Sequence, residues 1–158
     1  MRQNIRSTYL SEGIQPMQLK DISGGPPAVI LDKNASVMDV ISAMVENDVS
    51  SVVINRADAN DAYGLITITD IINDVIAMGL DPSTVKADDI SSKPLIAANN
   101  LDLDIRWVAK KMANEGVSQI AVFDSGELKC IVSDIDILKA VAKELQEKPT
   151  RKRGKKSD

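Results

Sequence analysis

The hydrophobic pattern of the chain changes its period in a fixed order, and it does so twice. A short apolar run after a proline predicts an edge strand, at 29–31 in the first round and at 95–97 in the second. Apolar residues three and four positions apart then predict a helix, with Ser36 as the first N-cap and Asp102 or Asp104 as the second. Two strands around a polar turn and another helix follow each time. The pattern predicts the unit β-α-β-β-α, present twice.

Turn signals bound the second part of each unit. In the first copy we expect a buried strand, a loose turn, a return strand and a helix, in that order, at 52–54, 56–62, 63–67 and 69–78. In the second copy the same elements are expected at 120–123, 124–127, 128–133 and 135–146. The second turn reads Asp-Ser-Gly-Glu, which is typical of a tight hairpin. Residues 80–88 are expected to link the copies.

Residue identities repeat in register with this pattern. The recurring segments are 21–23 and 89–91, 49–50 and 117–118, and 70–71 and 136–137. The first two pairs lie 68 residues apart and the last pair 66, so the first copy has a turn that is two residues longer. A surface loop tolerates such an insertion in a duplicated fold unit. We therefore predict an N-terminal segment at 1–16, fold units at 17–80 and 81–146, and a tail at 147–158.

Histidine, the commonest general base and metal ligand in proteins, is missing from the sequence. Among 158 residues there is no histidine, and Cys130 is the one cysteine. Nucleophile–histidine systems, an intramolecular disulfide and a cysteine-based zinc site are therefore excluded. The sequence has no apolar run long enough for a membrane span and no leader pattern at its start. We expect a cytoplasmic protein that is not an enzyme, holds no metal and does not contact a membrane.

Charge is distributed unevenly along the chain. The tail at 147–158 holds six basic residues against two acidic ones, whereas the whole chain has a formal net charge of −4. The body is therefore acidic, which argues against a nucleic-acid groove on the fold itself. We expect the tail to be disordered, and to act as a solubilising terminus or as an adaptor that contacts nucleic acid or an acidic protein partner.

The strand-to-helix junction is the most informative segment of each copy. It reads GLITITD at 64–70 and CIVSDID at 130–136, so a hydroxyl residue ends the strand and an aspartate follows three positions later. These residues are Thr67 and Asp70 in the first copy and Ser133 and Asp136 in the second. A helix N-terminus favours anions, a hydroxyl can hydrogen-bond a phosphate oxygen, and a carboxylate can accept both hydroxyls of a ribose. The pattern suits a nucleotide site.

Helix capping is the alternative interpretation of each junction. Thr67 or Ser133 would then cap the helix, and the aspartate would complement the helix dipole. A single occurrence would favour the cap. Its recurrence in register after the same strand favours a ligand site, because a cap requires no particular strand before it.

These junctions resemble the G-h-x-[ST]-x-x-[DN] signature of the CBS (cystathionine-β-synthase) domain, and the resemblance covers about residues 17–146. It implies an α+β fold in which two β-α-β-β-α CBS repeats pack sheet to sheet with pseudo-twofold symmetry and form two clefts. In similar proteins the hydroxyl residue meets phosphate and the acidic residue meets ribose. That implication carries over to Thr67 and Asp70 in one cleft, and to Ser133 and Asp136 in the other.

The same resemblance implies a function and further lining residues. The expected function is a regulatory sensor of an adenine nucleotide or adenosyl ligand (AMP, ADP, ATP or S-adenosylmethionine, with AMP or ATP favoured) that regulates a partner protein and forms a homodimer through its CBS helices. Residues of the opposite repeat are expected to receive the adenine. They are Ser91, Lys93, Leu95 and Ser118 facing Asp70, and Ser23, Pro26, Ala28 and Ser50 facing Asp136. Lys93 is a candidate cation for the first cleft, or else a solvated surface lysine.

Two departures from the family pattern distinguish the clefts. Cys130 stands where the signature has glycine, which matters if a positive φ is required there. Asp134 places an anion beside the expected phosphate of the second cleft. We therefore expect the cleft of Thr67 and Asp70 to be the better nucleotide site.

Overall fold

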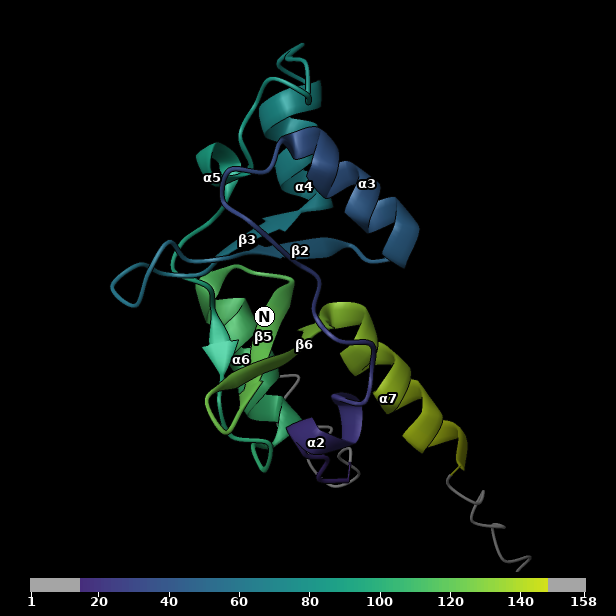
Figure 1. Cartoon of the computed structure of the whole chain (residues 1–158). Coiled ribbons are helices and arrows are strands. Elements are labelled where there is room, and N and C mark those ends of the chain that lie inside the picture. Colours follow the sequence, from purple (N-terminus) through teal and green to yellow (C-terminus); the bar gives the residue numbers. More distant parts are fainter. Residues whose placement is uncertain (1–14, 148–158) are drawn as a thin grey trace, which may run out of the picture.

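The computed structural model describes residues 15–147 (Figure 1). Most of the expected N-terminal segment at 1–16 and all but the first residue of the expected basic tail at 147–158 lie outside the described residues. Within the described range the chain forms two similar halves, each an α+β unit around a small three-stranded sheet.

The first half follows the expected order of elements. Its members are β1 (Ile30–Leu31), α3 (Val37–Asn47), β2 (Ser51–Ile54), β3 (Gly64–Thr67), α4 (Ile68–Ile71) and the π-helical segment η2 (Ile72–Ile76). The sheet order is β1-β2-β3, with β1 parallel and β3 antiparallel to β2. The helix expected at 69–78 is therefore present, but its second part winds as a π-helix rather than an α-helix.

The second half repeats this arrangement. Its members are β4 (Ala97–Ala98), α6 (Ile105–Glu115), β5 (Gln119–Asp124), β6 (Glu127–Ser133) and α7 (Asp134–Glu147). The sheet order β4-β5-β6 has the same parallel and antiparallel pairs as the first sheet. Registers agree as well, because Ser51 pairs with Thr67 in the first sheet and Gln119 with Ser133 in the second. The duplicated β-α-β-β-α unit is confirmed.

Local signals in the sequence explain where these elements start and stop. The Ser36 hydroxyl accepts the Asp39 N–H at 3.1 Å, and the Asp39 carboxylate accepts the Ser36 N–H at 2.9 Å, so α3 begins with a capping box. Helices α3 and α6 both end on a left-handed residue, Asp48 at φ 51° and Gly116 at φ 65°. The tight hairpin between β5 and β6 also forms as expected.

Two short helices were not expected, and each packs on the other half. Helix α2 (Leu19–Ile22) precedes the first half in sequence, yet Leu19 is fully buried in the core of the second half. Its N–H donates to the carbonyl of Leu103 at 2.7 Å. Helix α5 (Ala87–Ile90) precedes the second half and places Ala87 in the first core, with its N–H bonded to Ala35 at 2.8 Å. The two halves thus exchange their first helices.

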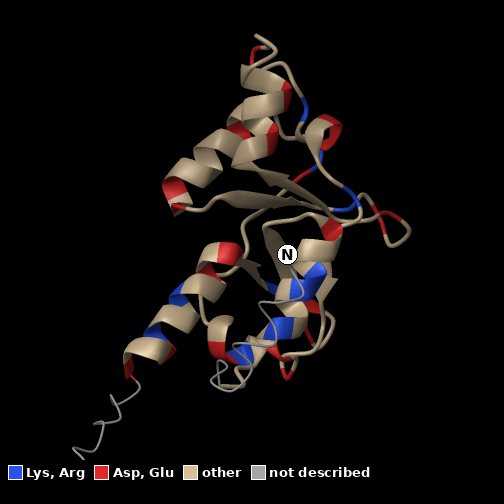
Figure 2. Cartoon of the chain, turned by 180° about the vertical axis from the view of Figure 1, so that it is seen from behind, with Lys and Arg blue, Asp and Glu red and all other residues tan. Residues whose placement is uncertain are grey.

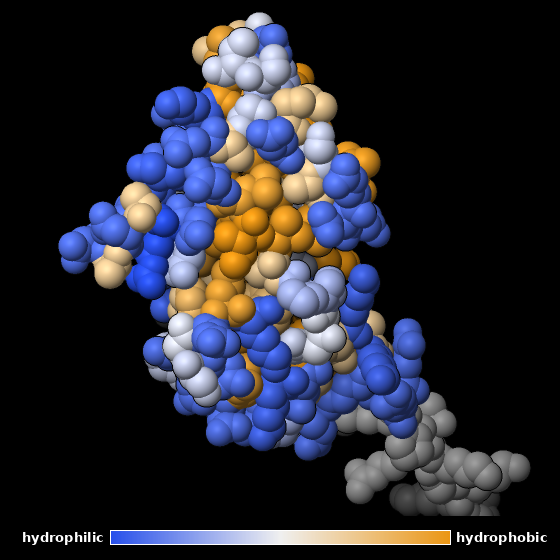
Figure 3. Space-filling model, viewed as in Figure 1, coloured by the Kyte–Doolittle hydropathy of each residue, from blue (hydrophilic) through white to orange (hydrophobic). Residues whose placement is uncertain are grey.

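The two sheets face one another across the middle of the molecule. In β2, Val52 and Ile54 belong to the first core, whereas Val53 between them is fully buried but belongs to neither core. Its counterpart Ala121 in β5 behaves in the same way. Because alternate residues of a strand point to opposite faces, Val53 and Ala121 face the opposite half. Sheet-to-sheet packing is therefore confirmed, and Figure 3 shows apolar residues gathered over this central region with hydrophilic residues on both flanks.

Within residues 15–147 no helix is both long enough and apolar enough to cross a membrane.

Candidate functional site

Two clefts of similar size lie between the halves, and each contains one of the two junctions. The Asp136 cleft has a volume of about 330 Å³ and the Asp70 cleft about 310 Å³. The Asp136 cleft is lined by Ile22, Gly25, Pro26, Pro27, Ala28, Val29, Asp48, Val49, Ser50, Ser51, Gln119, Cys130, Ile131, Ser133, Ile135, Asp136 and Lys139. The Asp70 cleft is lined by Leu65, Thr67, Thr69, Asp70, Ser92, Pro94, Leu95, Ile96, Gly116, Val117, Ser118 and Gln119.

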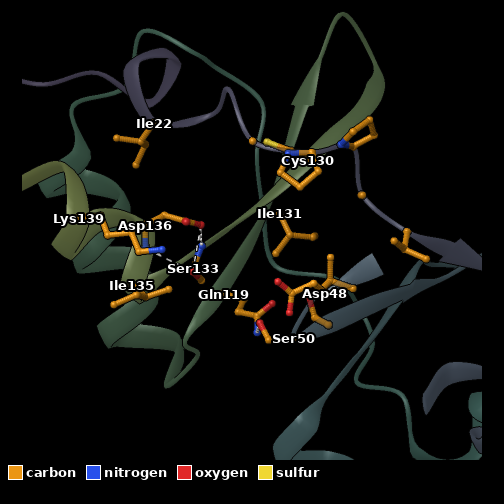
Figure 4. Close-up of a pocket in the computed structure, with 17 residues that line it drawn as sticks. Ile22, Asp48, Ser50, Gln119, Cys130, Ile131, Ser133, Ile135, Asp136 and Lys139 are labelled. Atoms are coloured by element: carbon orange, nitrogen blue, oxygen red, sulfur yellow. Dashed lines mark hydrogen bonds between the residues drawn. The ribbon is translucent and has the colours of Figure 1, made fainter. Parts of the chain in front are cut away.

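Most of the sequence-predicted site residues line these clefts. Thr67 and Asp70 of the first half meet Leu95 and Ser118 of the second half in the Asp70 cleft. In the Asp136 cleft, Ser133 and Asp136 of the second half meet Pro26, Ala28 and Ser50 (Figure 4). Each cleft therefore combines a junction from one half with a loop and a helix end from the other.

Ser23 and Ser91, which are counterparts in the repeat, do not line the clefts. Ser91 packs against Gly64, because its Oγ lies 2.7 Å from where a Cβ on Gly64 would be. Ser23 is buried, and its carbonyl accepts the thiol of Cys130 at 3.5 Å. Both serines therefore contact the first residue of a junction segment, Gly64 or Cys130, and do not line a cleft.

Lys93 also lies outside the lining residues of the Asp70 cleft. Its ammonium is 2.8 Å from an Asp88 carboxylate oxygen and 3.6 Å from one of Asp61. The hydrogen bond to Asp88, together with the nearby negative charges, raises the pKa of Lys93 above its ordinary value. This lysine ties α5 to the long turn of the first half, while its neighbours Ser92 and Pro94 line the cleft.

The two junctions have almost identical geometry. In the first, Oδ2 of Asp70 accepts the Thr67 N–H at 2.8 Å and the Thr67 hydroxyl at 3.0 Å. In the second, Oδ2 of Asp136 accepts the same two groups of Ser133 at the same two distances. The other carboxylate oxygen, Oδ1, has no hydrogen-bond partner among residues 15–147 in either case. Capping and ligand binding are therefore compatible, since the cap fixes a carboxylate that keeps one oxygen for a ligand.

Lys139 is a cleft residue that the sequence interpretation missed. It lies three positions after Asp136 on α7, lines the Asp136 cleft and has no ion-pair partner among the described residues. Its counterpart in the first half is Asn73, which is exposed and uncharged. Figure 2 shows the charges along α7, with acidic residues at its start and basic residues on the following turns. A lysine one helical turn beyond the motif acid was the signal that could have identified it.

The placement of charge removes the reason for preferring the Asp70 cleft. Asp134 does not line the Asp136 cleft, and its carboxylate accepts the Ile135 N–H at 2.7 Å. The charged residues of the Asp136 cleft are therefore the acids Asp48 and Asp136 and the cation Lys139, without the expected anion from Asp134. The Asp70 cleft, in contrast, has Asp70 as the one charged residue of its lining.

The exchange of glycine for cysteine at the start of the motif has a steric explanation. Neither Gly64 nor Cys130 has a positive φ, so glycine is not required there for its conformational freedom. A Cβ on Gly64 would lie 2.7 Å from the Ser91 Oγ and 2.9 Å from its Cβ. At Cys130 the side chain is accommodated with 2% exposure, and burial raises the pKa of its thiol.

Comparison with known proteins agrees with this duplicated architecture. The family model described as CBS domain matches residues 19–77 and 87–143. An uncharacterized protein of Methanopyrus kandleri is 29% identical over 120 residues, which make up 75% of this chain and 57% of that protein. The chain thus spans little more than half the length of this curated relative.

Solved structures show the same fold. The hexameric CBS-CP12 protein from bloom-forming cyanobacteria is 29% identical, with a TM-score of 0.75 over 89% of this chain and 80% of that one. A CBS domain protein from Pyrobaculum aerophilum, solved in complex with AMP, is 22% identical, with a TM-score of 0.68 over 82% of this chain and 98% of that one. At 22% identity, the second similarity shows a shared fold.

Proposed function

The chain belongs to the CBS domain family, and we propose that it is a non-enzymatic regulatory module that binds an adenine nucleotide in the clefts between its two halves. The observation that carries this proposal is the pair of junctions. Each presents an oriented carboxylate with a free oxygen to a cleft that both halves line. The AMP complex of the Pyrobaculum aerophilum relative supports the choice of ligand class.

The Asp136 cleft offers a partner for each part of a nucleotide. The Asp136 carboxylate can accept the ribose hydroxyls, and the Ser133 hydroxyl and the Lys139 ammonium can bind a phosphate. Aliphatic and proline side chains from the first half and from β6 give the adenine an apolar surface. They are Pro26, Pro27, Ala28, Val29 and Ile131. Lys139 gives AMP and ATP a phosphate contact that an adenosyl ligand without phosphate would lack, although the cleft also holds the acids Asp48 and Asp136.

Binding would act on how the two halves are positioned relative to each other. A ligand that touches Asp136 on one side and Ser50 on the other stabilises the arrangement in which both are within reach. Occupancy would therefore shift the population of arrangements, and a partner protein would respond to that shift. This is how a protein without catalytic side chains can report the concentration of a nucleotide.

Calorimetry with AMP, ADP, ATP and S-adenosylmethionine tests the proposal on the wild type, Asp70→Ala, Asp136→Ala and the double variant. Each single variant should lose one binding event. Asp136→Ala should reduce the binding of phosphate-bearing ligands more than Asp70→Ala does. A matched control is Asp74→Ala, which removes the same charge from η2 but lies outside both cleft linings. Undiminished binding by the double variant would overturn the assignment.

Self-association through the helices is part of the proposal. Each half has an apolar groove of about 510 Å³ on its helical side, one between α3 and α4–η2 and one between α6 and α7. Ile68, Ile72 and Ile76 are each 50% exposed along the first of these. Association of two chains over such faces would remove them from water, and the hexameric cyanobacterial relative supports assembly in this family.

Light scattering on the wild type and on Ile72→Asp tests the association. The wild type should have at least twice the mass of the chain, and the variant should be a monomer because its carboxylate would be buried unpaired at the interface. Asp74→Ala is again the control. A monomeric wild type at micromolar concentration would contradict this part of the proposal.

The adaptor alternative depends on the basic tail, which lies outside the described residues and stays a prediction. Removal of residues 148–158 followed by an RNA-binding titration at several salt concentrations separates it from the nucleotide sensor. A steep salt dependence that vanishes with the tail would favour the adaptor.

A further inference from the structure

The two clefts meet at one side chain, that of Gln119. It is the first residue of β5, pairs with Ser133 across the sheet, and lines both the Asp136 cleft and the Asp70 cleft. No other described residue lines both. Its counterpart in the repeat is Ser51, which pairs with Thr67 in the same register but lines the Asp136 cleft alone.

The amide of Gln119 is buried and half satisfied. The residue is 7% exposed, and its Nε2 donates to the Ser50 hydroxyl of the opposite half at 3.1 Å (Figure 4). Its Oε1 is buried and has no hydrogen-bond partner among residues 15–147. Buried amide oxygens nearly always have a partner in folded proteins, because an unpaired one keeps the full penalty of losing water. The oxygen is closed off in the observed arrangement, and a small turn of the amide toward either cleft would let it accept a hydrogen bond from a cleft occupant.

We propose that the Gln119 amide hydrogen-bonds a ligand in either cleft but in only one at a time. Occupation of one cleft therefore weakens binding in the other. This inference rests on the proposed nucleotide-binding function. A ligand N–H, such as the amino group of adenine, would donate to Oε1 from whichever cleft fills first. The side chain adopts one set of torsion angles at a time, so that contact orients the amide for the first ligand. The second ligand then meets a cleft in which this acceptor is already engaged.

The amide also connects the first ligand to the opposite half. Because Nε2 is held by Ser50, a shift of the amide toward an occupant either keeps or breaks a bond that crosses between the halves. Ser50 itself lines the Asp136 cleft, so the hydroxyl that holds the Gln119 amide belongs to one of the two sites. Sequence alone could not show this, because Gln119 belongs to no motif and precedes the strand expected at 120–123.

Calorimetry with AMP provides the test, in which each cleft is measured alone and then together. Asp70→Ala leaves the Asp136 cleft, and Asp136→Ala leaves the Asp70 cleft. In the wild type, the second AMP should bind about threefold to tenfold more weakly than AMP binds to the same cleft alone. A factor of this size corresponds to the loss of one neutral hydrogen bond. Gln119→Met, which keeps the length of the side chain and removes its polar atoms, should abolish this difference.

A matched control is Ser51→Ala, which removes a polar side chain at the repeat-equivalent position from one cleft only. It should change the affinity of the Asp136 cleft, but AMP should still bind about threefold to tenfold more weakly as the second ligand than it binds to the same cleft alone. A second readout does not require the Gln119→Met variant. In amide NMR spectra of the two single-cleft proteins, AMP should shift the side-chain NH₂ signals of Gln119 in both.

The outcomes separate the inference from the function on which it rests. The nucleotide site would stand and the sharing of Gln119 would be overturned if AMP binding is lost completely only in the Asp70→Ala, Asp136→Ala double variant and each cleft of the wild type binds AMP as tightly as the same cleft alone. A weakened second event that persists in Gln119→Met would also overturn it. AMP binding that ignores both aspartates would instead remove the proposed function itself.

Discussion

The Asp136 cleft and the Asp70 cleft are formed by copies of one unit, and the comparison separates what the duplication kept from what it changed. The junction hydrogen bonds are the same, at 2.8 and 3.0 Å in both. Several counterpart side chains around them differ, and three of these pairs change the chemistry or packing of the clefts. These are Ser51 and Gln119, Gly64 and Cys130, and Asn73 and Lys139. The conserved part orients a carboxylate, and the changed parts set which ligand it meets.

A fourth difference lies in the exchanged helices. Leu19 of α2 and Ala87 of α5 are counterparts, and each is fully buried in the core of the other half. The second core thus receives a leucine where the first receives an alanine. The same exchange therefore joins the halves with side chains of different size.

Leu19→Ala carries the largest expected effect, because it gives the second core the residue that the first core accepts. It should lower the free energy of unfolding by about 2–5 kcal/mol, since it leaves a cavity in a packed core. Urea denaturation followed by circular dichroism measures the change. The control Val45→Ala removes methyl groups from a side chain that is 77% exposed and should change stability by less than about 0.5 kcal/mol. Equal effects of the two variants would show that α2 does not contribute to the second core.

The second largest effect is expected at Gly64. Gly64→Ala should destabilise the protein by about 1–3 kcal/mol, because the new methyl group would overlap the side chain of Ser91. The same denaturation assay applies. Cys130→Ala should cost less than this, since it shortens a side chain at a position that already holds a Cβ.

A paired substitution sharpens this comparison. The variant Gly64→Ala with Ser91→Gly removes the atoms that Gly64→Ala would contact, so it should recover most of the lost stability. If the double variant is as unstable as Gly64→Ala alone, the glycine is retained for a reason other than its contact with Ser91.

The sequence was sufficient for the fold because the evidence was redundant. Periodicity, turn residues and an internal repeat all indicated the same unit, and the N-cap at Ser36 formed as expected. The exchange of α2 and α5 could not be predicted, because four-residue helices offer too few positions for a period. Their local sequence pattern does not indicate which half they contact.

The site was predictable in part for a related reason. The junction acids and hydroxyls belong to a motif, and the structure places all four on cleft walls. Gln119 and Lys139 belong to no motif, and their relevance follows from how two sheets and a helix meet. Lys93 was a candidate on charge alone, and the acidic residues Asp61 and Asp88 that pair with it come from segments that only the fold brings near.

The smallest expected effect concerns the cation that distinguishes the two clefts. Lys139→Gln should weaken AMP binding to the Asp136 cleft by up to about fivefold, because an exposed charge contributes little in water. The loss should shrink as salt is added, since screening weakens the same attraction in the wild type. The reciprocal change Asn73→Lys places a cation at the counterpart position of η2, and should strengthen AMP binding to the Asp70 cleft by a similar factor. Calorimetry in the Asp70→Ala and Asp136→Ala backgrounds assigns each change to its cleft. If Lys139→Gln acts equally on AMP and on adenosine, the lysine packs against the nucleoside and does not bind its phosphate, and the charge difference between the clefts would then have no bearing on ligand choice.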